Sequence, residues 1–283
     1  MHLYKTSKGN VLQNDTKSVL LEDDWDTLIN RQDLYQHLSQ LASSTEAISE
    51  EHKEYLISNF LLAPVGNQEV WAAGVTYLRS RDARMEESED SGAADCYERV
   101  YEAERPELFF KSLPHRVAGH KEPVYIRKDS TWNVPEPELT LYINAQGSIQ
   151  AYTIGNDMSS RSIEGENPLY LPQAKTYERS AAIGPCLFVT SEPISLNTSI
   201  RMDIFRNSEK MFDDATTLTQ MKRSPGELAG WLYREMDFKA GCFLMTGTCV
   251  VPPSAFTLQK EDIVNISIDG IGTLSNIIAE KAP

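Results

Sequence analysis

Short segments in which hydrophobic and polar residues alternate occupy the chain from about residue 122 onward. They are PVYIRK, ELTLYI, GSIQAYTIG, PCLFVT, SIRMDIFR, CFLMTGTCVV and DIVNISIDGIGTL, separated by Gly, Pro, Asn and Asp. A period of two is typical of strands with one buried face, and the separating residues favour turns. The pattern predicts a mostly β region with few helices. One of these helices is predicted in SPGELAGWLYREM, where Ser224 precedes Pro225 in a favourable helix start.

Residues 1–68 are predicted to form a small α/β unit of their own. Short alternation near the start is followed by DTLINRQDLYQHLSQLAS, in which Leu28, Leu34, Leu38 and Leu41 recur at roughly helical intervals. A break at LAPVGNQE precedes the β-favouring segment VWAAGVTY, and a charged stretch with helical parts follows it. We therefore predict an α+β, mostly β fold with a small N-terminal domain at 1–68 and a larger domain at 69–283.

The charge balance narrows the class of partner. The 283 residues include 41 acidic and 27 basic residues, and a strongly negative protein is repelled by phosphate backbones and anionic lipids. We therefore expect no nucleic acid and no membrane as partner. The start of the chain lacks an apolar core of signal-peptide length, and no later run approaches about 18 apolar residues, which predicts a cytoplasmic protein.

The four cysteines are scattered through the chain. None of Cys96, Cys186, Cys242 and Cys249 belongs to a CxxC pair, and no histidine ladder lies beside them. A disulfide framework or a thiolate zinc site is therefore not expected, and reduced thiols in the core are the default.

The stretch TWNVPEPELTLYINAQGSIQAYTIGND predicts a β-hairpin that carries three carboxylates. The tetrapeptide NAQG favours a turn between ELTLYI and SIQAYTIG. With residues 144–147 as the loop, Glu138 faces Thr153 and Glu136 faces Gly155. Because side chains alternate along a strand, one face of this hairpin then carries Glu136, Glu138, Thr153, Gly155 and Asp157.

Three carboxylates within hydrogen-bonding reach repel one another unless protons or a cation compensate them. A hard divalent cation is the simplest compensation, and oxygen-only ligands suit Mg²⁺, Mn²⁺ or Ca²⁺. The alternative is that Glu136 and Glu138 lie on the solvent face of an edge strand, where the neighbouring prolines are also tolerated. A bulge at Pro137 would turn the side chains to the other face.

Four motifs in this order resemble the fumarylacetoacetate hydrolase superfamily. PEPELTL, YTIGNDMSSRSIE, QAK and LMTGT match its ExE pair, DxSxR segment, downstream lysine and TGT turn, and the resemblance covers about residues 70 to 283. RPELFFKSLPHRVAGH, ENPLYLPQAK and TGTCVVPP are most similar to its 2-keto-3-deoxy-D-arabinonate dehydratase branch. The resemblance implies a mixed β-roll catalytic domain behind a small N-terminal domain, and assembly as a homodimer or homotetramer.

The resemblance also implies the site residues. Carried over residue by residue, the Mg²⁺ ligands are Glu136, Glu138 and Asp157, and the active-site lysine is Lys175. Part of the wall around the substrate carboxylate is formed by Thr246, Gly247 and Thr248.

One departure from the family pattern bears on the reaction. Hydrolases of this superfamily carry a water-activating histidine three residues after the tyrosine of a GLNY-like strand end, and here GVTYLRSRDAR places Ser80 at that position. A serine without a nearby base activates water poorly. The dehydratase branch is expected to share this substitution. His115 and His120 remain as candidate substitutes, with ordinary structural roles as the alternative for each.

The expected substrate is therefore a 2-keto-3-deoxy sugar acid, whose carboxylate and ketone can chelate Mg²⁺. Lys175 and Glu107 are the candidates for the acid and base, because burial and nearby charge can move the pKa of either group toward neutrality. The candidates for further substrate contacts are Arg79, Ser80, Arg81, Lys111, Glu164 and Glu166, with Glu166 favoured over Glu164 and exposed salt bridging as the alternative for the arginines. The acidic run EESED is interpreted as a solvated face or a lid segment.

Two other classes of function stay open on the sequence. The first is a Mg²⁺-dependent C–C hydrolase or decarboxylase acting on an acylpyruvate, another diketo acid or oxaloacetate, in which His115, His120 or a water held by Glu107 would assist. The second is a non-catalytic binding module in which the carboxylates only fix the structure. The lysine and the TGT turn disfavour the second class, since a purely structural metal site does not need them.

Overall fold

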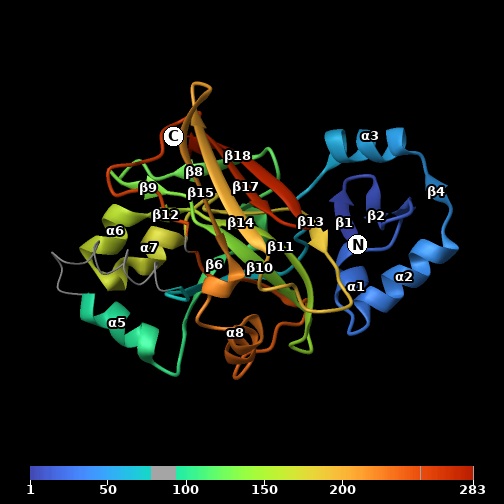
Figure 1. Cartoon of the computed structure of the whole chain (residues 1–283), viewed down its shortest axis with the longest axis horizontal. Helices are drawn as coiled ribbons and strands as arrows, with labels where there is room; N and C mark the ends of the chain where they lie inside the picture. The colour runs from blue at the N-terminus through green and yellow to red at the C-terminus, as the bar shows by residue number, and fades with distance from the viewer. Residues whose placement is uncertain (78–93, 249, 283) are drawn as a thin grey trace.

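The computed structural model describes residues 1–77, 94–248 and 250–282 (Figure 1). Within these residues, an eleven-stranded sheet, a five-stranded sheet and a set of short helices form three layers. Helices α1 (Trp25–Ile29) and α2 (Leu34–Ser44) cover one face of the larger sheet near the N-terminus, and the smaller sheet packs against the opposite face. The predicted mostly β character is confirmed.

The large sheet has eleven strands within the described residues. Its order is β4-β3-β2-β1-β13-β11-β10-β16-β5-β6, and β7 pairs with β13 beside this path. The bounds are β1 His2–Thr6, β2 Gly9–Gln13, β3 Ser18–Leu21, β4 Ala47–Ile48, β5 Glu69–Gly74, β6 Glu107–Ser112, β7 Val117–Ala118, β10 Pro137–Ile143, β11 Ile149–Asp157, β13 Ala181–Phe188 and β16 Cys242–Met245.

The smaller sheet has the strand order β15-β14-β17-β18-β8, and β9 pairs with β12 in a separate two-stranded ladder. The bounds are β8 Pro123–Ile126, β9 Asn133–Val134, β12 Ser159–Ser160, β14 Ser199–Arg206, β15 Glu209–Thr217, β17 Ile263–Ile268 and β18 Gly272–Glu280. The hairpin of β14 and β15 extends beyond the rest of the sheet at the top of Figure 1. Strand β15 was not predicted, because its sequence EKMFDDATT is mostly polar.

The helices are short and lie around the sheets. Their bounds are α1 Trp25–Ile29, α2 Leu34–Ser44, α3 Glu50–Phe60, α5 Ala94–Glu102, α6 Arg161–Glu166, α7 Leu171–Lys175 and α8 Pro225–Leu232, with 3₁₀ turns at Pro114–Arg116, Pro168–Tyr170 and Leu218–Gln220. The predicted start of α8 is confirmed: the side chain of Ser224 accepts a hydrogen bond from the backbone of Glu227, and Pro225 is the first helical residue. Among the described residues, no helix is both long and apolar enough to cross a membrane.

Each face of the large sheet contributes to a separate hydrophobic core. On one face, Tyr142, Ala151 and Phe243 pack with the N-terminal helices through Leu28 and Leu38. On the other face, alternate strand residues pack against the smaller sheet and α8; they include Leu139, Leu141, Ile154, Met202, Leu228 and Ile266. The large sheet is therefore buried on both sides, and its polar side chains need partners.

The predicted hairpin forms, but its register differs from the prediction by two residues. Strands β10 and β11 are antiparallel, and Glu138 lies opposite Gly155, where Thr153 was predicted. The loop is longer than assumed, and a bulge follows Tyr142 on the loop side of the ladder. A shift of two residues keeps every side chain on its predicted face. The conclusion that the carboxylates share one face is therefore unaffected.

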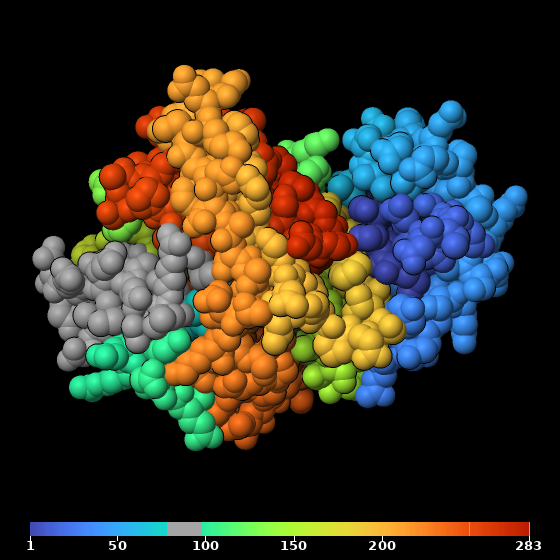
Figure 2. Space-filling view, viewed as in Figure 1, coloured from blue at the N-terminus to red at the C-terminus, as the bar shows by residue number. Residues whose placement is uncertain are grey.

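The N-terminal residues extend the large sheet. Strand β1 pairs with β13, matching His2 with Phe188 and Leu3 with Leu187. In the space-filling view these residues, in blue, form one end of the molecule and lie directly against the rest (Figure 2). The boundary at residue 68 stays a prediction, and the strand pairing shows how closely the two parts are joined.

Candidate functional site

Three buried carboxylates meet at one end of the large sheet. Glu136, Glu138 and Asp157 each offer one oxygen atom, and these atoms all lie within 4.8 Å of one another. These residues are 3%, 1% and 1% exposed in that order. Glu136 precedes β10, Glu138 is its second residue and Asp157 ends β11. The solvent-face alternative for the two glutamates is therefore wrong.

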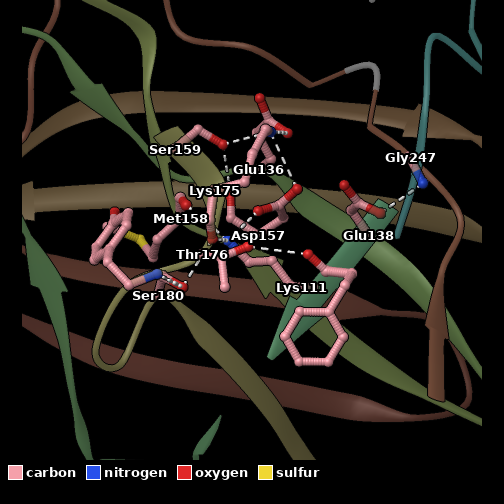
Figure 3. A network of polar contacts seen from close by, with 12 residues as sticks. Lys111, Glu136, Glu138, Asp157, Met158, Ser159, Lys175, Thr176, Ser180 and Gly247 are labelled. Carbon is pink, nitrogen blue, oxygen red and sulfur yellow. Dashed lines mark hydrogen bonds and ion pairs between the residues drawn. The ribbon is translucent and has the colours of Figure 1, made fainter. Parts of the chain in front are cut away.

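Lys175, the last residue of α7, lies between two of these carboxylates (Figure 3). Its Nζ atom donates to Glu136 Oε2 at 2.6 Å, to Asp157 Oδ2 at 3.0 Å and to Ser159 Oγ at 2.6 Å. Three donated bonds, two of them to carboxylates, are the pattern of a protonated ammonium group. Lys175 therefore carries a positive charge in this arrangement.

Arg161 and Lys111 supply two more cations. Arg161 Nη2 donates to Glu136 Oε1 at 2.7 Å, and Lys111 Nζ lies 2.5 Å from Asp157 Oδ1. Both side chains are almost completely buried. Burial lowers the pKa of Lys111, although the Asp157 carboxylate opposes this effect. Each oxygen of Glu136 and Asp157 thus faces a cation.

The pKa values of two of the carboxyl groups shift in opposite directions. Burial, followed by the charges of Asp157 and Glu136, raises the pKa of Glu138 well above its usual range. Burial also opposes ionisation of Asp157, but the ion pairs with Lys111 and Lys175 outweigh it and lower the pKa. Glu138 is therefore the carboxylate for which a further cation would matter most.

The TGT turn after β16 supports the site through its backbone. The Gly247 N–H donates to Glu138 Oε2 at 2.5 Å, and Gly247 has φ +93°, which favours glycine. Thr246 uses its hydroxyl within the fold, donating to the carbonyl of Leu139 at 2.8 Å. Thr248 lines the cavity beside the carboxylates, as does Gly247.

Glu107, the first residue of β6, lies opposite Gly74 of β5. A Cβ atom at Gly74 would lie only 1.9 Å from Glu107 Oε2, so the glycine provides the room that this carboxylate occupies. Gly74 lines the same cavity as Glu136, Glu138, Asp157 and Lys175. Glu107 itself does not line this cavity but lines a neighbouring one, together with Pro106 and Leu108, so its catalytic role stays a prediction.

The other residues predicted to contact the substrate do not line the cavity in the part of the chain that the structure describes. Glu166 is exposed on α6, whereas Glu164 is 1% exposed, so the preference for Glu166 has no support from its position. Lys111 does not line the cavity, and it lies beneath Asp157. Arg79, Ser80, Arg81 and the EESED run lie outside the described residues.

The histidines considered as water activators are not at the cavity. His115 is exposed in the 3₁₀ turn Pro114–Arg116. His120 accepts a hydrogen bond at Nδ1 from the backbone N–H of Ser275, and burial lowers its pKa. Neither belongs to the set of residues that lines the site.

Three residues that contact the charged cluster or line the cavity were not among the predicted site residues. Two of them lie in the DxSxR segment, which the sequence had already indicated. Ser159 and Arg161 follow Asp157 at intervals of two residues in the DxSxR motif, and both contact the charged cluster. Phe109, which lines the cavity and whose ring centroid is 5.9 Å from Lys175 Nζ, was also not named. The motif spacing was the available indication for the first two.

Comparison with known proteins agrees with this arrangement. The family model for the fumarylacetoacetate (FAA) hydrolase C-terminal region matches residues 70–279. The chain belongs to the fumarylacetoacetate hydrolase family. The resemblance inferred from the motifs is thereby confirmed.

Two relatives are similar to the chain over most of their length. The chain is 44% identical over 243 residues to a probable 2-keto-3-deoxyxylonate dehydratase of Haloferax volcanii, covering 85% of this chain and 82% of the relative. It is 40% identical over 222 residues to a 2-dehydro-3-deoxy-D-arabinonate dehydratase of Saccharolobus solfataricus, covering 77% and 74%.

A solved structure of 2-keto-3-deoxyarabinonate dehydratase is 30% identical to the chain, with a TM-score of 0.83 and coverage of 100% and 99%. Another, 2-keto-3-deoxy-D-arabinonate dehydratase complexed with magnesium and 2,5-dioxopentanoate, is 28% identical, with a TM-score of 0.82 and the same coverage. The predicted fold class is therefore confirmed.

Proposed function

We propose that this protein is a Mg²⁺-dependent hydro-lyase that converts a 2-keto-3-deoxypentonate to α-ketoglutarate semialdehyde, which is 2,5-dioxopentanoate. The observation that carries the proposal is the buried set of Glu136, Glu138 and Asp157 with Lys175 beside it. The names of the two relatives, and the magnesium and 2,5-dioxopentanoate bound to a protein of the same fold, support the substrate class. The reaction belongs to sugar acid catabolism.

The residues present fit a hard divalent cation. Three carboxylates offer oxygen ligands within 4.8 Å of one another, and burial, followed by the charges of Asp157 and Glu136, raises the pKa of Glu138. Oxygen ligands favour Mg²⁺, and Mn²⁺ or Ca²⁺ can replace it in such sites. Glu136, Glu138 and Asp157 would hold the ion. When bound, it would supply positive charge that polarises the 2-keto group and stabilises negative charge developing on it.

The protein residues would carry out the proton transfers. Glu107 would accept the C3 proton, and the electron pair of the C3–H bond would be delocalised toward the ketone. Lys175, already an ammonium, would donate a proton to the C4 hydroxyl as the C4–O bond breaks and water leaves. The resulting C3=C4 double bond moves to C4=C5 by transfer of a proton from C5 to C3. The enol at C5 then becomes the aldehyde.

The turn after β16 would bind the other end of the substrate. Gly247 and Thr248 line the cavity next to Glu138 and would form part of the wall around the substrate carboxylate. Thr246 would act indirectly, because its hydroxyl is bound to Leu139. The roles of Arg79, Ser80 and Arg81 in holding substrate hydroxyls stay predictions.

We also propose that the protein works in the cytoplasm as a homodimer or homotetramer. Cys186 and Cys242 are free and buried, which suits a reducing compartment. The oligomeric assembly rests on the family resemblance, and a size-exclusion measurement with light scattering tests it.

Product analysis tests the reaction. Protein loaded with Mg²⁺ should convert a 2-keto-3-deoxypentonate to 2,5-dioxopentanoate with the loss of one water, detected by mass spectrometry, and chelation should stop this conversion. Acylpyruvates should be cleaved far more slowly, because a water without a general base lacks a rate contribution of about 10²- to 10⁴-fold. Release of pyruvate faster than dehydration of every 3-deoxy acid tested would replace the proposal with a C–C hydrolase.

A further inference from the structure

Lys111 has a role that its burial and its bonding partners define. Its side chain is 0% exposed on β6, and it does not line the cavity. Its ammonium lies 2.5 Å from Asp157 Oδ1, donates to the Met158 carbonyl at 2.9 Å and donates to the carbonyl of Lys175 (Figure 3). These contacts direct the ammonium toward Asp157 and the two carbonyl groups, whereas Lys175 is the lysine that lines the cavity.

We propose that Lys111 is a positioning residue that holds the metal ligand Asp157 and the proton donor Lys175 in a fixed relation to each other. The inference rests on the proposed function, because it assumes that Asp157 binds a cation and that Lys175 acts in catalysis. It replaces the expectation that Lys111 contacts the substrate.

The first half of this role concerns the orientation of Asp157. A carboxylate group rotates readily about its terminal bond, and its two oxygens are equivalent in isolation. Here Lys111 engages Oδ1, while Oδ2 accepts a hydrogen bond from Lys175. Lys111 therefore decides which oxygen of Asp157 is presented to a cation.

The second half concerns the end of α7. Lys175 is the last residue of this five-residue helix, and its carbonyl is one of the groups left without a helical partner there. Lys111 and the hydroxyl of Ser180, at 2.9 Å, both donate to that carbonyl. The next residue, Thr176, is tied to the same strand as Lys111, since its hydroxyl donates to the Phe110 carbonyl at 3.0 Å. Strand β6 thus fixes the backbone from which the Lys175 side chain extends.

The substitution Lys111→Met tests the proposal through metal binding, measured with Mn²⁺ alone by isothermal titration calorimetry on folded protein. Loss of a group that orients a ligand should weaken Mn²⁺ binding about 10- to 100-fold. At saturating metal, kcat should fall by at least about 10-fold with little change in KM, since no substrate contact is removed. Lys53→Met is the matched control: Lys53 is 5% exposed and paired with Glu50 in α3, and its loss should leave the Mn²⁺ affinity unchanged.

The direction of the change separates positioning from two other roles. If Lys111 acted only as a positive charge near the ion, its removal would strengthen Mn²⁺ binding. If it only stabilised the fold, the melting temperature would fall and the Mn²⁺ affinity of the folded protein would stay the same. Either result overturns the inference.

A second variant covers the case in which Lys111→Met does not fold. Lys111→Gln keeps two N–H donors on a side chain that is uncharged and one bond shorter, so it should bind Mn²⁺ more weakly than wild type. Wild-type Mn²⁺ affinity in folded Lys111→Gln overturns the inference while the proposed function stands. Absence of Mn²⁺ binding by the wild-type protein overturns the metal-dependent function itself, together with the inference that rests on it.

Discussion

Glu138 differs from the other two carboxylates in its contacts. Glu136 and Asp157 are each paired with two cations, whereas Glu138 accepts a hydrogen bond from the backbone of Gly247. Its raised pKa follows from burial and from the two neighbouring carboxylates. Without a bound cation, the charge of Glu138 therefore opposes folding, and with one it becomes a ligand. The negative charge of Glu138 therefore lowers the stability of the metal-free protein and is needed for metal binding.

This conflict predicts effects of opposite sign for two conservative substitutions. In metal-free protein, Glu138→Gln should raise the free energy of unfolding by about 1 kcal/mol, because it removes a buried like charge and can keep the bond from Gly247. Asp157→Asn should lower it by about 3 kcal/mol or more, because Lys111 loses its buried partner. Both should lower turnover by at least about 100-fold. Urea unfolding in the presence of chelator measures the stabilities, and destabilisation by Glu138→Gln would contradict the electrostatic account.

At the scale of single residues, the sequence identified the groups that carry the chemistry more reliably than their orientation. Glu136, Glu138, Asp157 and Lys175 do converge. Lys111 was predicted to contact the substrate, because a sequence does not reveal whether the side chain of a lysine points into a cavity or away from it. That orientation depends on the partners that long-range folding supplies, here the carbonyl groups of Met158 and Lys175.

At the scale of elements, the sequence predicted which face of a strand each side chain occupies more accurately than it predicted the register between strands. The hairpin prediction assumed a regular four-residue loop, but the ladder contains a bulge after Tyr142 and the register shifts by two residues. The shared face survived because the shift was even. Strand β15 and helix α3 escaped prediction because they are largely polar, and pairing or packing with a neighbour stabilises such elements.

The pairing of β5 with β6 predicts that Gly74 is needed for proton transfer. A Cβ atom in Gly74→Ala would lie 1.9 Å from Glu107 Oε2, so the carboxylate must move. A displacement of this size should lower turnover about 10- to 100-fold. The exchange of C3 protons of the substrate into D₂O, followed by NMR, should slow in parallel, as it should in Glu107→Gln. The affinity for Mn²⁺ should not change, since the three ligands are untouched.

Gly230→Ala provides a matched control for this prediction. Gly230 lies in α8, and a Cβ atom there would have no heavy-atom neighbour within 4 Å outside its own helix and chain neighbours. This variant should keep normal turnover and normal C3 exchange. Unchanged exchange in both Gly74→Ala and Glu107→Gln would instead assign proton abstraction to another group.

At the scale of the whole molecule, the site joins parts of the chain that are distant in sequence. Its carboxylates come from the hairpin of β10 and β11, its lysine from α7, and the backbone donor to Glu138 from the turn after β16. In an unfolded chain these groups are far apart, so a cation that needs all of them binds the folded state almost exclusively. Metal binding and global stability are therefore linked.

This linkage predicts a measurable effect of metal on the melting temperature. At a Mg²⁺ concentration of 100 times Kd, the folded state should gain about 2.7 kcal/mol, which for a chain of this size raises the melting temperature by roughly 4 to 5 °C. Differential scanning calorimetry with Mg²⁺, against chelator with NaCl at equal ionic strength, measures the shift. Glu138→Gln should lose most of it while remaining folded, which separates binding at this site from a general salt effect. Equal melting temperatures of the wild-type protein in Mg²⁺ and in chelator would show that the carboxylates do not bind the ion, because a ligand specific for the folded state cannot bind without stabilising it.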